Sequence, residues 1–170
     1  MESFGFYGAE LEAGGYSDVG LARNLLFNGM LRTPFEWMIC VDSDIGFRRN
    51  DMHRLMEWKG PKDYAVHGVY AKKDDSGAAV TQGLGFARIH RSVLEAIKSH
   101  IPFTFVREGI EMQDFCITGT SAAGYLREDT GFWFLCSQVG VRARLIWDLN
   151  LKHYGGRRAY EVSELQKRNT

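Results

Sequence analysis

FEWMICVDSDIGF, residues 35–47, joins an apolar strand to a pair of charges. The five residues from Trp37 to Val41 favour a β-strand, which ends in the carboxylates of Asp42 and Asp44, with Gly46 behind them. Ionised carboxylates are not left in an apolar core without a partner. The strand must therefore emerge at an edge where solvent or a cation meets both aspartates.

The composition indicates one globular domain. The chain has 170 residues, of which 45% are hydrophobic, enough for a sizeable core. We expect a single domain over residues 1–170, with the charged segment 157–170 as a loosely packed tail. The 21 Lys and Arg residues balance 21 Asp and Glu residues, so no overall field attracts nucleic acid or an anionic membrane. No nucleic-acid partner is expected.

The cysteines and the hydropathy of the chain favour a reducing compartment and a soluble protein. Cys40, Cys116 and Cys136 are odd in number and widely spaced, a pattern that predicts neither a disulfide framework nor a zinc site. The first residues do not form a basic segment followed by a long apolar run. No stretch approaches the roughly 20 apolar residues of a membrane span. We expect a soluble, cytoplasmic protein without a transmembrane segment.

Apolar periodicity places helices and strands in alternation along the chain. Helices are predicted at 17–31, 50–60, 92–99 and 129–140. Strands are predicted at 37–42, 63–71, 83–90 and 141–151. Residues 72–79 are expected to form a polar surface loop, and residues 103–124 are left unassigned. The alternation predicts an α/β fold with a mostly parallel sheet covered by helices on both faces. Ligands of such sheets bind beyond the carboxyl ends of the strands, where Asp42 and Asp44 would lie.

Two interpretations of the aspartate pair remain open. Asp42 and Asp44 could both reach one divalent cation after the backbone bends, and carboxylate oxygens suit Mg²⁺ or Mn²⁺. Alternatively, one of them accepts backbone hydrogen bonds in an Asx-type turn, with Gly46 supplying unusual dihedral angles.

A second acidic pair and one histidine have similar alternatives. Glu128 and Asp129 precede a predicted helix, where a carboxylate can act as a general base or cap the helix. His153 follows the last predicted strand, either as a metal ligand or as an ordinary residue at the sheet edge. The remaining histidines are interpreted as ordinary helix, strand or surface residues: His53, His67, His90 and His100.

The order of several short motifs resembles glycosyltransferases of the GT-A fold, most closely the small family-2-like enzymes. The resemblance covers most of the chain, from about Ser17 to Tyr154, and rests on LARN, DSDIGF, DYAVHGVYAKK, LGFARIHRSVLEAI, REDTGFWFLCSQVG and LKHYG. It implies the Rossmann-like three-layer sandwich of nucleotide-diphospho-sugar transferases. It also implies metal-dependent transfer of a sugar from a nucleotide diphosphate to a hydroxyl acceptor.

The resemblance implies a donor site that contains a divalent metal, Mn²⁺ or Mg²⁺. Asp42-Ser43-Asp44 matches the DxD motif, in which Asp44 would bind the metal and Asp42 would contact the ribose or assist at the metal. His153 would complete the metal site, and Arg23 would approach the diphosphate. The segment 83–86, which includes Gly85, would border the donor sugar.

The acceptor side follows from the same resemblance. Glu128 and Asp129 match the acidic pair there, and Asp129 would be the base that deprotonates the attacking hydroxyl. The implied partners are a UDP- or GDP-sugar donor and a glycan or other hydroxyl acceptor. A homo-oligomer is left open.

One departure from the family concerns the segment before Asp42. The 41 residues ahead of it leave room only for residues 3–8 as the second strand, so we expect an N-terminally shortened fold without the first base-binding strand and helix. An alternative is therefore a non-catalytic, degenerate domain that binds a sugar nucleotide or glycan. A haloacid-dehalogenase-like phosphatase with Asp42 as nucleophile is a weaker alternative, because Gly46 stands where that family has Thr or Val.

Overall fold

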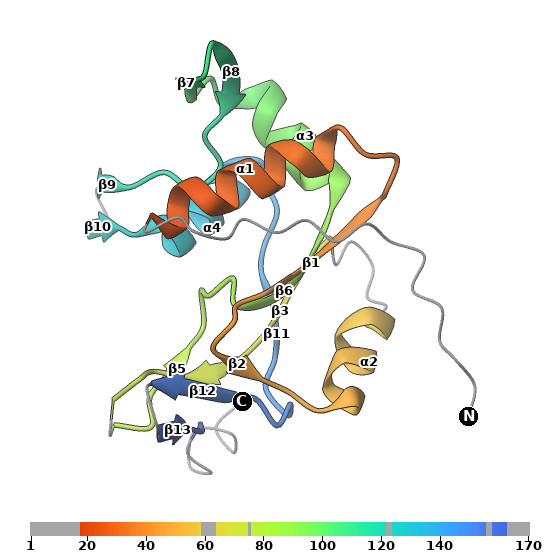
Figure 1. Cartoon of the computed structure of the whole chain (residues 1–170), viewed down its shortest axis with the longest axis vertical. Helices are drawn as coiled ribbons and strands as arrows, with labels where there is room; N and C mark the ends of the chain where they lie inside the picture. The colour runs from red at the N-terminus through yellow and green to blue at the C-terminus, as the bar shows by residue number, and fades with distance from the viewer. Residues whose placement is uncertain (1–17, 59–63, 75, 122–123, 156–157, 163–170) are drawn as a thin grey trace.

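A four-stranded sheet occupies the centre of the protein (Figure 1). The computed structural model describes residues 18–58, 64–74, 76–121, 124–155 and 158–162. The strands of the central sheet lie in the order β1 (Trp37–Val41), β6 (Phe86–His90), β3 (Ala65–Gly68) and β11 (Arg144–Ile146). Strand β6 is antiparallel to both β1 and β3, and β3 and β11 are parallel.

The prediction of a mostly parallel, Rossmann-like three-layer sandwich is therefore wrong. Parallel neighbours need a long crossover connection, usually a helix. Between β3 and β6 the described residues instead form a hairpin of β4 (Tyr70–Ala71) and β5 (Ala79–Val80), after which the chain returns antiparallel to β3. The surface loop expected at 72–79 is confirmed for its described residues up to 78, which connect the two strands of this hairpin, whereas Ala79 belongs to β5. Because β6 lies between them, β1 and β3 still run in the same direction.

Small antiparallel sheets surround the central one. Strand β12 (Lys152–Gly155) pairs with β2 (Ile45–Gly46) and with β13 (Arg158–Tyr160). The long strand expected at 141–151 is wrong, because only Arg144–Ile146 form β11. The later leucines of that alternating pattern, Leu149 and Leu151, are buried in the following loop. His153 consequently lies within β12, opposite Ile45 of β2.

The unassigned segment 103–124 forms most of two further hairpins. The first joins β7 (Thr104–Arg107) to β8 (Ile110–Gln113), and the second contains β9 (Gly119–Ser121) and β10 (Gly124–Leu126). The turn of the first hairpin is Glu108-Gly109, with φ of 52° and 77°. Two consecutive positive φ values are typical of the tight turns that match the twist of β-hairpins.

Helices pack on both faces of the central sheet (Figure 1). They are α1 (Val19–Leu31), α2 (Arg49–Glu57), α3 (Arg91–His100) and α4 (Glu128–Gln138). Successive side chains of a strand point to opposite faces. Accordingly, Ala87 and Ile89 of β6 pack among residues of α1, α3 and α4, whereas Phe86 packs with Leu55 of α2.

Helix α1 is fixed by hydrogen bonds to a segment far along the chain. Asp18 caps the helix by accepting a hydrogen bond from the Leu21 N–H at 3.1 Å. The Asn24 side-chain oxygen accepts the backbone N–H groups of Phe115 and Cys116 at 2.8 and 3.0 Å. Its amide donates to Asp114 at 2.8 Å. These bonds fix the position of Arg23, the residue that precedes Asn24.

Some expectations concern the ends of the chain. The strand expected at residues 3–8 lies outside the described residues, as do residues 163–170. Within the expected loose tail, Arg158–Tyr160 form β13, and Val162 is buried. None of the described helices has the length and apolar character that a membrane span requires.

Candidate functional site

The two aspartates lie in a tight turn between β1 and β2. The Ile45 N–H donates to the Asp42 carbonyl at 3.0 Å, and the Asp42 N–H donates to the Gly85 carbonyl at the same distance. The turn is therefore closed by backbone atoms. The Asp42 carboxylate is bound by a side chain of α1 instead, so the Asx-type interpretation does not describe Asp42.

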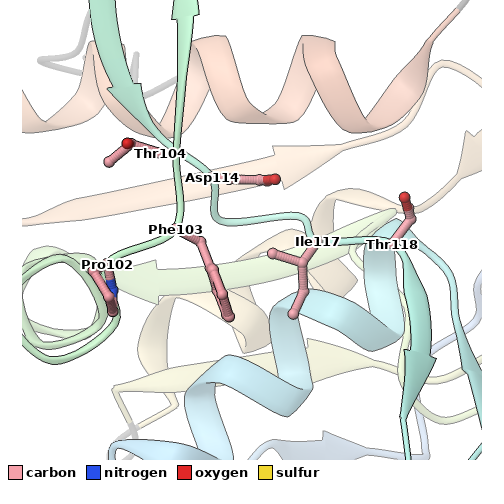
Figure 2. A pocket seen from close by; sticks show the side chains of 6 residues that line it. All are labelled: Pro102, Phe103, Thr104, Asp114, Ile117 and Thr118. Atoms are coloured by element: carbon pink, nitrogen blue, oxygen red, sulfur yellow. The ribbon is translucent and has the colours of Figure 1, made fainter.

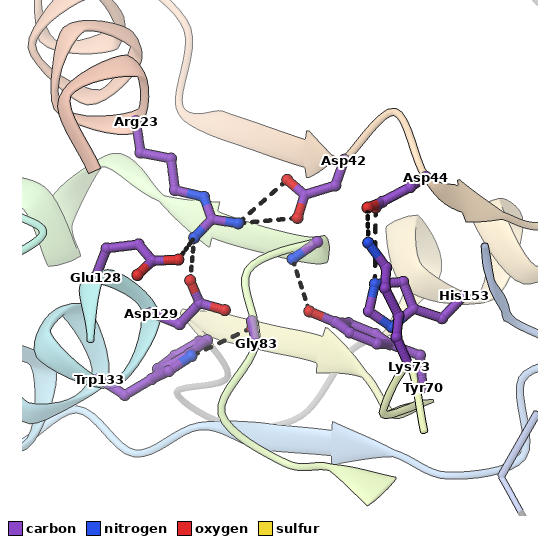
Figure 3. Close-up of polar contacts among 11 residues, drawn as sticks. Arg23, Asp42, Asp44, Tyr70, Lys73, Gly83, Glu128, Asp129, Trp133 and His153 are labelled. Carbon is purple, nitrogen blue, oxygen red and sulfur yellow. Dashed lines mark hydrogen bonds and ion pairs between the residues drawn. The ribbon is translucent and has the colours of Figure 1, made fainter. Parts of the chain in front are cut away.

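Arg23 joins Asp42 to the acidic pair at the start of α4 (Figure 3). Its Nη2 donates to both Asp42 oxygens, at 2.9 and 3.2 Å. Its Nη1 donates to Asp129 and contacts Glu128 at 3.5 Å. Arg23 is only 7% exposed, so its guanidinium is shielded from water, whereas the side chains of Asp42 and Glu128 are 37% and 30% exposed. The structure thus brings together three predicted carboxylates and Arg23.

Burial and charge set the protonation of this cluster. Burial is the largest influence on Asp129, followed by the opposing charge of Arg23 and the like charge of Glu128, and the pKa of Asp129 is raised to about 6. Burial lowers the pKa of Arg23, but the charges of Asp129 and Asp42 outweigh it, and that pKa lies above its usual value. One guanidinium faces three carboxylates, so an excess of negative charge favours a proton on Asp129.

The raised pKa predicts a pH dependence of stability. Because the folded-state pKa exceeds the ordinary value of 3.8, the contribution of Asp129 to stability is complete below about pH 4 and is lost as the pH rises through about 6. We expect the free energy of unfolding of the wild type to fall by about 2–3 kcal/mol relative to Asp129→Asn between about pH 4 and about pH 7. Urea denaturation at several pH values measures this. Parallel profiles for the two proteins would contradict it.

Asp44 belongs to a second group with Lys73 and His153. Lys73 forms an ion pair with one Asp44 oxygen. The other, Oδ1, is buried without a hydrogen-bond partner among the described residues, and lies 3.8 Å from His153 Nε2. His153 Nδ1 lies 2.7 Å from the Ala71 carbonyl, which can only accept, so Nδ1 carries a proton. In the neutral ring, Nε2 then keeps a lone pair.

This geometry fits a divalent cation with part of its ligand shell from the protein. A buried carboxylate oxygen and an imidazole nitrogen face each other as acceptors, and the second ring nitrogen is fixed by a backbone carbonyl, as in many metal sites. No group of three or more His, Cys, Asp or Glu side chains with the spacing of a metal site occurs in the described part of the chain. Asp42, the third expected ligand, is paired with Arg23 instead. A metal here would take its remaining ligands from phosphate and water, as Mg²⁺ commonly does.

Gly85 lies where no side chain fits. A Cβ atom on Gly85 would be 2.8 Å from Asp42 Oδ2 and 3.0 Å from the Tyr70 hydroxyl. The Gly85 N–H also donates to that hydroxyl at 3.2 Å. The glycine therefore allows the chain to pass between Asp42 and Tyr70 before it enters β6.

Gly85→Ala is expected to lower the free energy of unfolding by about 1–3 kcal/mol, because the added methyl group overlaps both neighbours. Chemical denaturation measures this effect. In a Tyr70→Phe background one of the two obstructing atoms is gone, so the same substitution should cost less. An equal cost in both backgrounds would show that the hydroxyl does not restrict this position.

Lys73 and Tyr70 were not expected at the site. Lys73 stands in a polar, glycine-containing segment, and such a lysine carries no signal of its own. Tyr70 stands in an apolar strand pattern that predicts only burial. Both arrive through the β4–β5 hairpin, which the sequence pattern did not predict.

Comparisons with known proteins give one structural relative. No family model matches the chain, and no curated protein matches it. The crystal structure of A197 from STIV superposes with a TM-score of 0.53 at 14% sequence identity, covering 88% of this chain and 78% of that chain. At this identity the similarity establishes a shared fold alone.

Proposed function

We propose that the chain is a metal-dependent glycosyltransferase that moves a sugar from a nucleoside diphosphate to a hydroxyl acceptor. One observation carries the proposal: Arg23 holds the aspartate after β1 against the acidic pair of α4, beside the facing atoms of Asp44 and His153. Sugar transfer needs two groups of residues side by side. One stabilises the charge on the departing diphosphate, and the other accepts the proton of the acceptor hydroxyl.

On the donor side, Asp44 and His153 would hold the cation. A bound Mg²⁺ or Mn²⁺ would act as a Lewis acid and stabilise the negative charge on the diphosphate. Lys73 adds a second positive charge next to Asp44, on a side chain that is 40% exposed and therefore accessible to a phosphate. A UDP- or GDP-sugar remains the expected donor.

On the acceptor side, Asp129 would remove the hydroxyl proton. A general base works best when its pKa is near the operating pH, and the raised pKa of Asp129 meets this condition better than that of an ordinary aspartate. Arg23 was expected to approach the diphosphate, but its guanidinium donates hydrogen bonds to Asp42 and Asp129 instead. Its buried charge would orient these two carboxylates.

The contacts of Asp42 weigh against the phosphatase alternative. A nucleophilic aspartate must present a free oxygen to phosphorus, whereas both Asp42 oxygens accept hydrogen bonds from a buried guanidinium. All three cysteines are free thiols, in keeping with the proposed cytoplasmic location.

The metal role predicts a thermal shift. Mn²⁺ together with UDP or GDP, at about 100 times the dissociation constant, should raise the melting temperature of the wild type by about 5–10 °C. Asp44→Ala and His153→Ala should each remove most of this shift. Asp148→Ala is the matched control, because Asp148 is an exposed aspartate paired with Arg54. An unchanged shift in Asp44→Ala would refute the metal role.

Catalysis is tested by incubating UDP-, GDP-, CDP- and dTDP-sugars with the protein and Mn²⁺. Slow release of the nucleoside diphosphate from one donor, abolished by Asp44→Ala, is the expected result. Binding of a donor without any turnover would favour the non-catalytic alternative. Phosphate release from simple monoesters would favour the phosphatase.

A further inference from the structure

Two surface hollows are both lined in part by the segment 114–118, and neither is lined by Arg23, Asp42, Glu128 or Asp129. The first has a volume of about 380 Å³ and is lined by Pro102, Phe103, Thr104, Asp114, Ile117 and Thr118 (Figure 2). The second, of about 200 Å³, includes Asp18, Gly20 and Phe105 in its lining. Asp114 and Thr118 line both hollows, so the two hollows are adjacent on the surface.

The first hollow is lined by an aromatic ring that is not part of the hydrophobic core. Phe103 is 50% exposed, although its backbone is firmly held. Its carbonyl accepts the Asp114 N–H at 2.7 Å and the Gln113 side-chain amide at 2.8 Å. These bonds fix the backbone of Phe103, and both Phe103 and Asp114 line the first hollow. The negative face of an aromatic ring attracts slightly positive C–H groups, such as those on the face of a pyranose.

The polar groups of the hollows suit a ligand rich in hydroxyls. Asp114 Oδ1 accepts hydrogen bonds from Asn24 at 2.8 Å and from the Cys116 N–H at 3.2 Å, which hold the carboxylate in place. A carboxylate has further acceptor capacity, so Asp114 can also receive bonds from ligand hydroxyls. Two carboxylates, Asp18 and Asp114, and no Lys or Arg are among the described lining residues. This charge disfavours anionic polymers.

The second hollow borders the acidic pair of α4. A Cβ atom on Gly20, which lines this hollow, would lie 3.3 Å from the Glu128 Cβ. Glu128 precedes Asp129, the carboxylate paired with Arg23. The end of the second hollow at Gly20 is therefore separated from the acidic pair by one packed contact of α1 with α4.

From this arrangement we propose that the two hollows bind the acceptor, and that the acceptor is an uncharged oligosaccharide. Phe103 stacks on one sugar ring, and Asp114 accepts hydrogen bonds from the hydroxyls. The inference rests on the transferase function proposed above, because that function makes the ligand of this surface an acceptor.

Binding is measured without donor or metal, by NMR titration with short oligosaccharides of glucose, mannose and N-acetylglucosamine, and with hyaluronan fragments as anionic probes. We expect at least one uncharged series to bind and the anionic fragments not to bind. Phe103→Ala should weaken binding by about tenfold or more, and Phe103→Tyr, which keeps the ring, should retain it. Tyr64→Ala is the matched control, since Tyr64 is a similarly exposed aromatic residue, 42%, that lines neither hollow.

The outcomes separate this inference from the transferase proposal. Failure of every uncharged series to bind, equal binding by Phe103→Ala, or equal binding of hyaluronan would each overturn the acceptor site. Donor hydrolysis by the wild type, measured without acceptor, tests the transferase independently. Oligosaccharide binding that depends on Phe103, without any donor consumption, would keep the binding site and refute sugar transfer.

Discussion

Asp129→Asn is expected to lower the rate of sugar transfer by a factor of about 10²–10⁴, because an amide cannot take the acceptor proton. Donor binding should remain close to that of the wild type, since Asp129 lies with Arg23 and not with Asp44 and His153. Transfer is measured by product formation with the donor identified in the hydrolysis screen, and donor binding by calorimetry.

The pH profile provides the control for this prediction. In the wild type, transfer should rise as Asp129 ionises, with a limb near its pKa of about 6. Glu128→Gln removes the more distant carboxylate of the pair and should leave transfer much closer to the wild type. Equal losses of transfer and donor binding in Asp129→Asn would make Asp129 a structural residue.

Arg23→Met should be the most destabilising of the site substitutions. It leaves Asp42 and Asp129, whose side chains are 37% and 20% exposed, without their shared cation, so the loss should approach but not exceed the cost of about 3–5 kcal/mol for removal of one partner of a fully buried ion pair. Urea denaturation at neutral pH measures the loss. Arg54→Met is the control, because the exposed pair of Arg54 with Asp148 should contribute less than about 1 kcal/mol.

A second substitution identifies the cause of this loss. Adding Asp129→Asn to Arg23→Met removes one of the unpaired charges, so the double variant should recover part of the stability. Lowering the pH to about 5 should act in the same direction, because it favours the protonated form of Asp129, whose pKa is raised to about 6. A double variant that is less stable than Arg23→Met would show that the lost packing of Arg23, and not charge, dominates.

Sequence features within single segments predicted the four helices and the first strand of the central sheet. The strand at 37–41 is recognisable from its apolar, β-favouring residues. Its end is recognisable because the charged Asp42 cannot continue into an apolar core without a partner. The helices are also recognisable, since caps and apolar spacing act within one segment. The direction of β6 is not a local property: residues 83–90 look the same in a parallel or an antiparallel strand. Only the hairpin between β3 and β6 decides it.

The site required information that a single segment does not contain. The ion pair of Arg23 with Asp129 joins residues 106 positions apart, and each of them alone has an ordinary helical explanation. The prediction of a long strand at 141–151 failed because the alternating apolar residues belong to two elements. Leu145 lies in β11, whereas Leu149 and Leu151 are buried in the loop that follows it. Burial of a loop against a core produces the same alternation as a strand.

The bonds of α1 have a consequence for the order of events during synthesis. Arg23 pairs with Asp129 106 residues later in the chain, and Asn24 with Asp114 90 residues later. At the usual speed of translation, about 5–20 residues per second, α1 leaves the ribosome about 5–20 s before Asp129. During this interval Phe27 and Met30, buried in the finished protein, lack much of their cover, so the nascent chain exposes apolar surface until the later segments have been made.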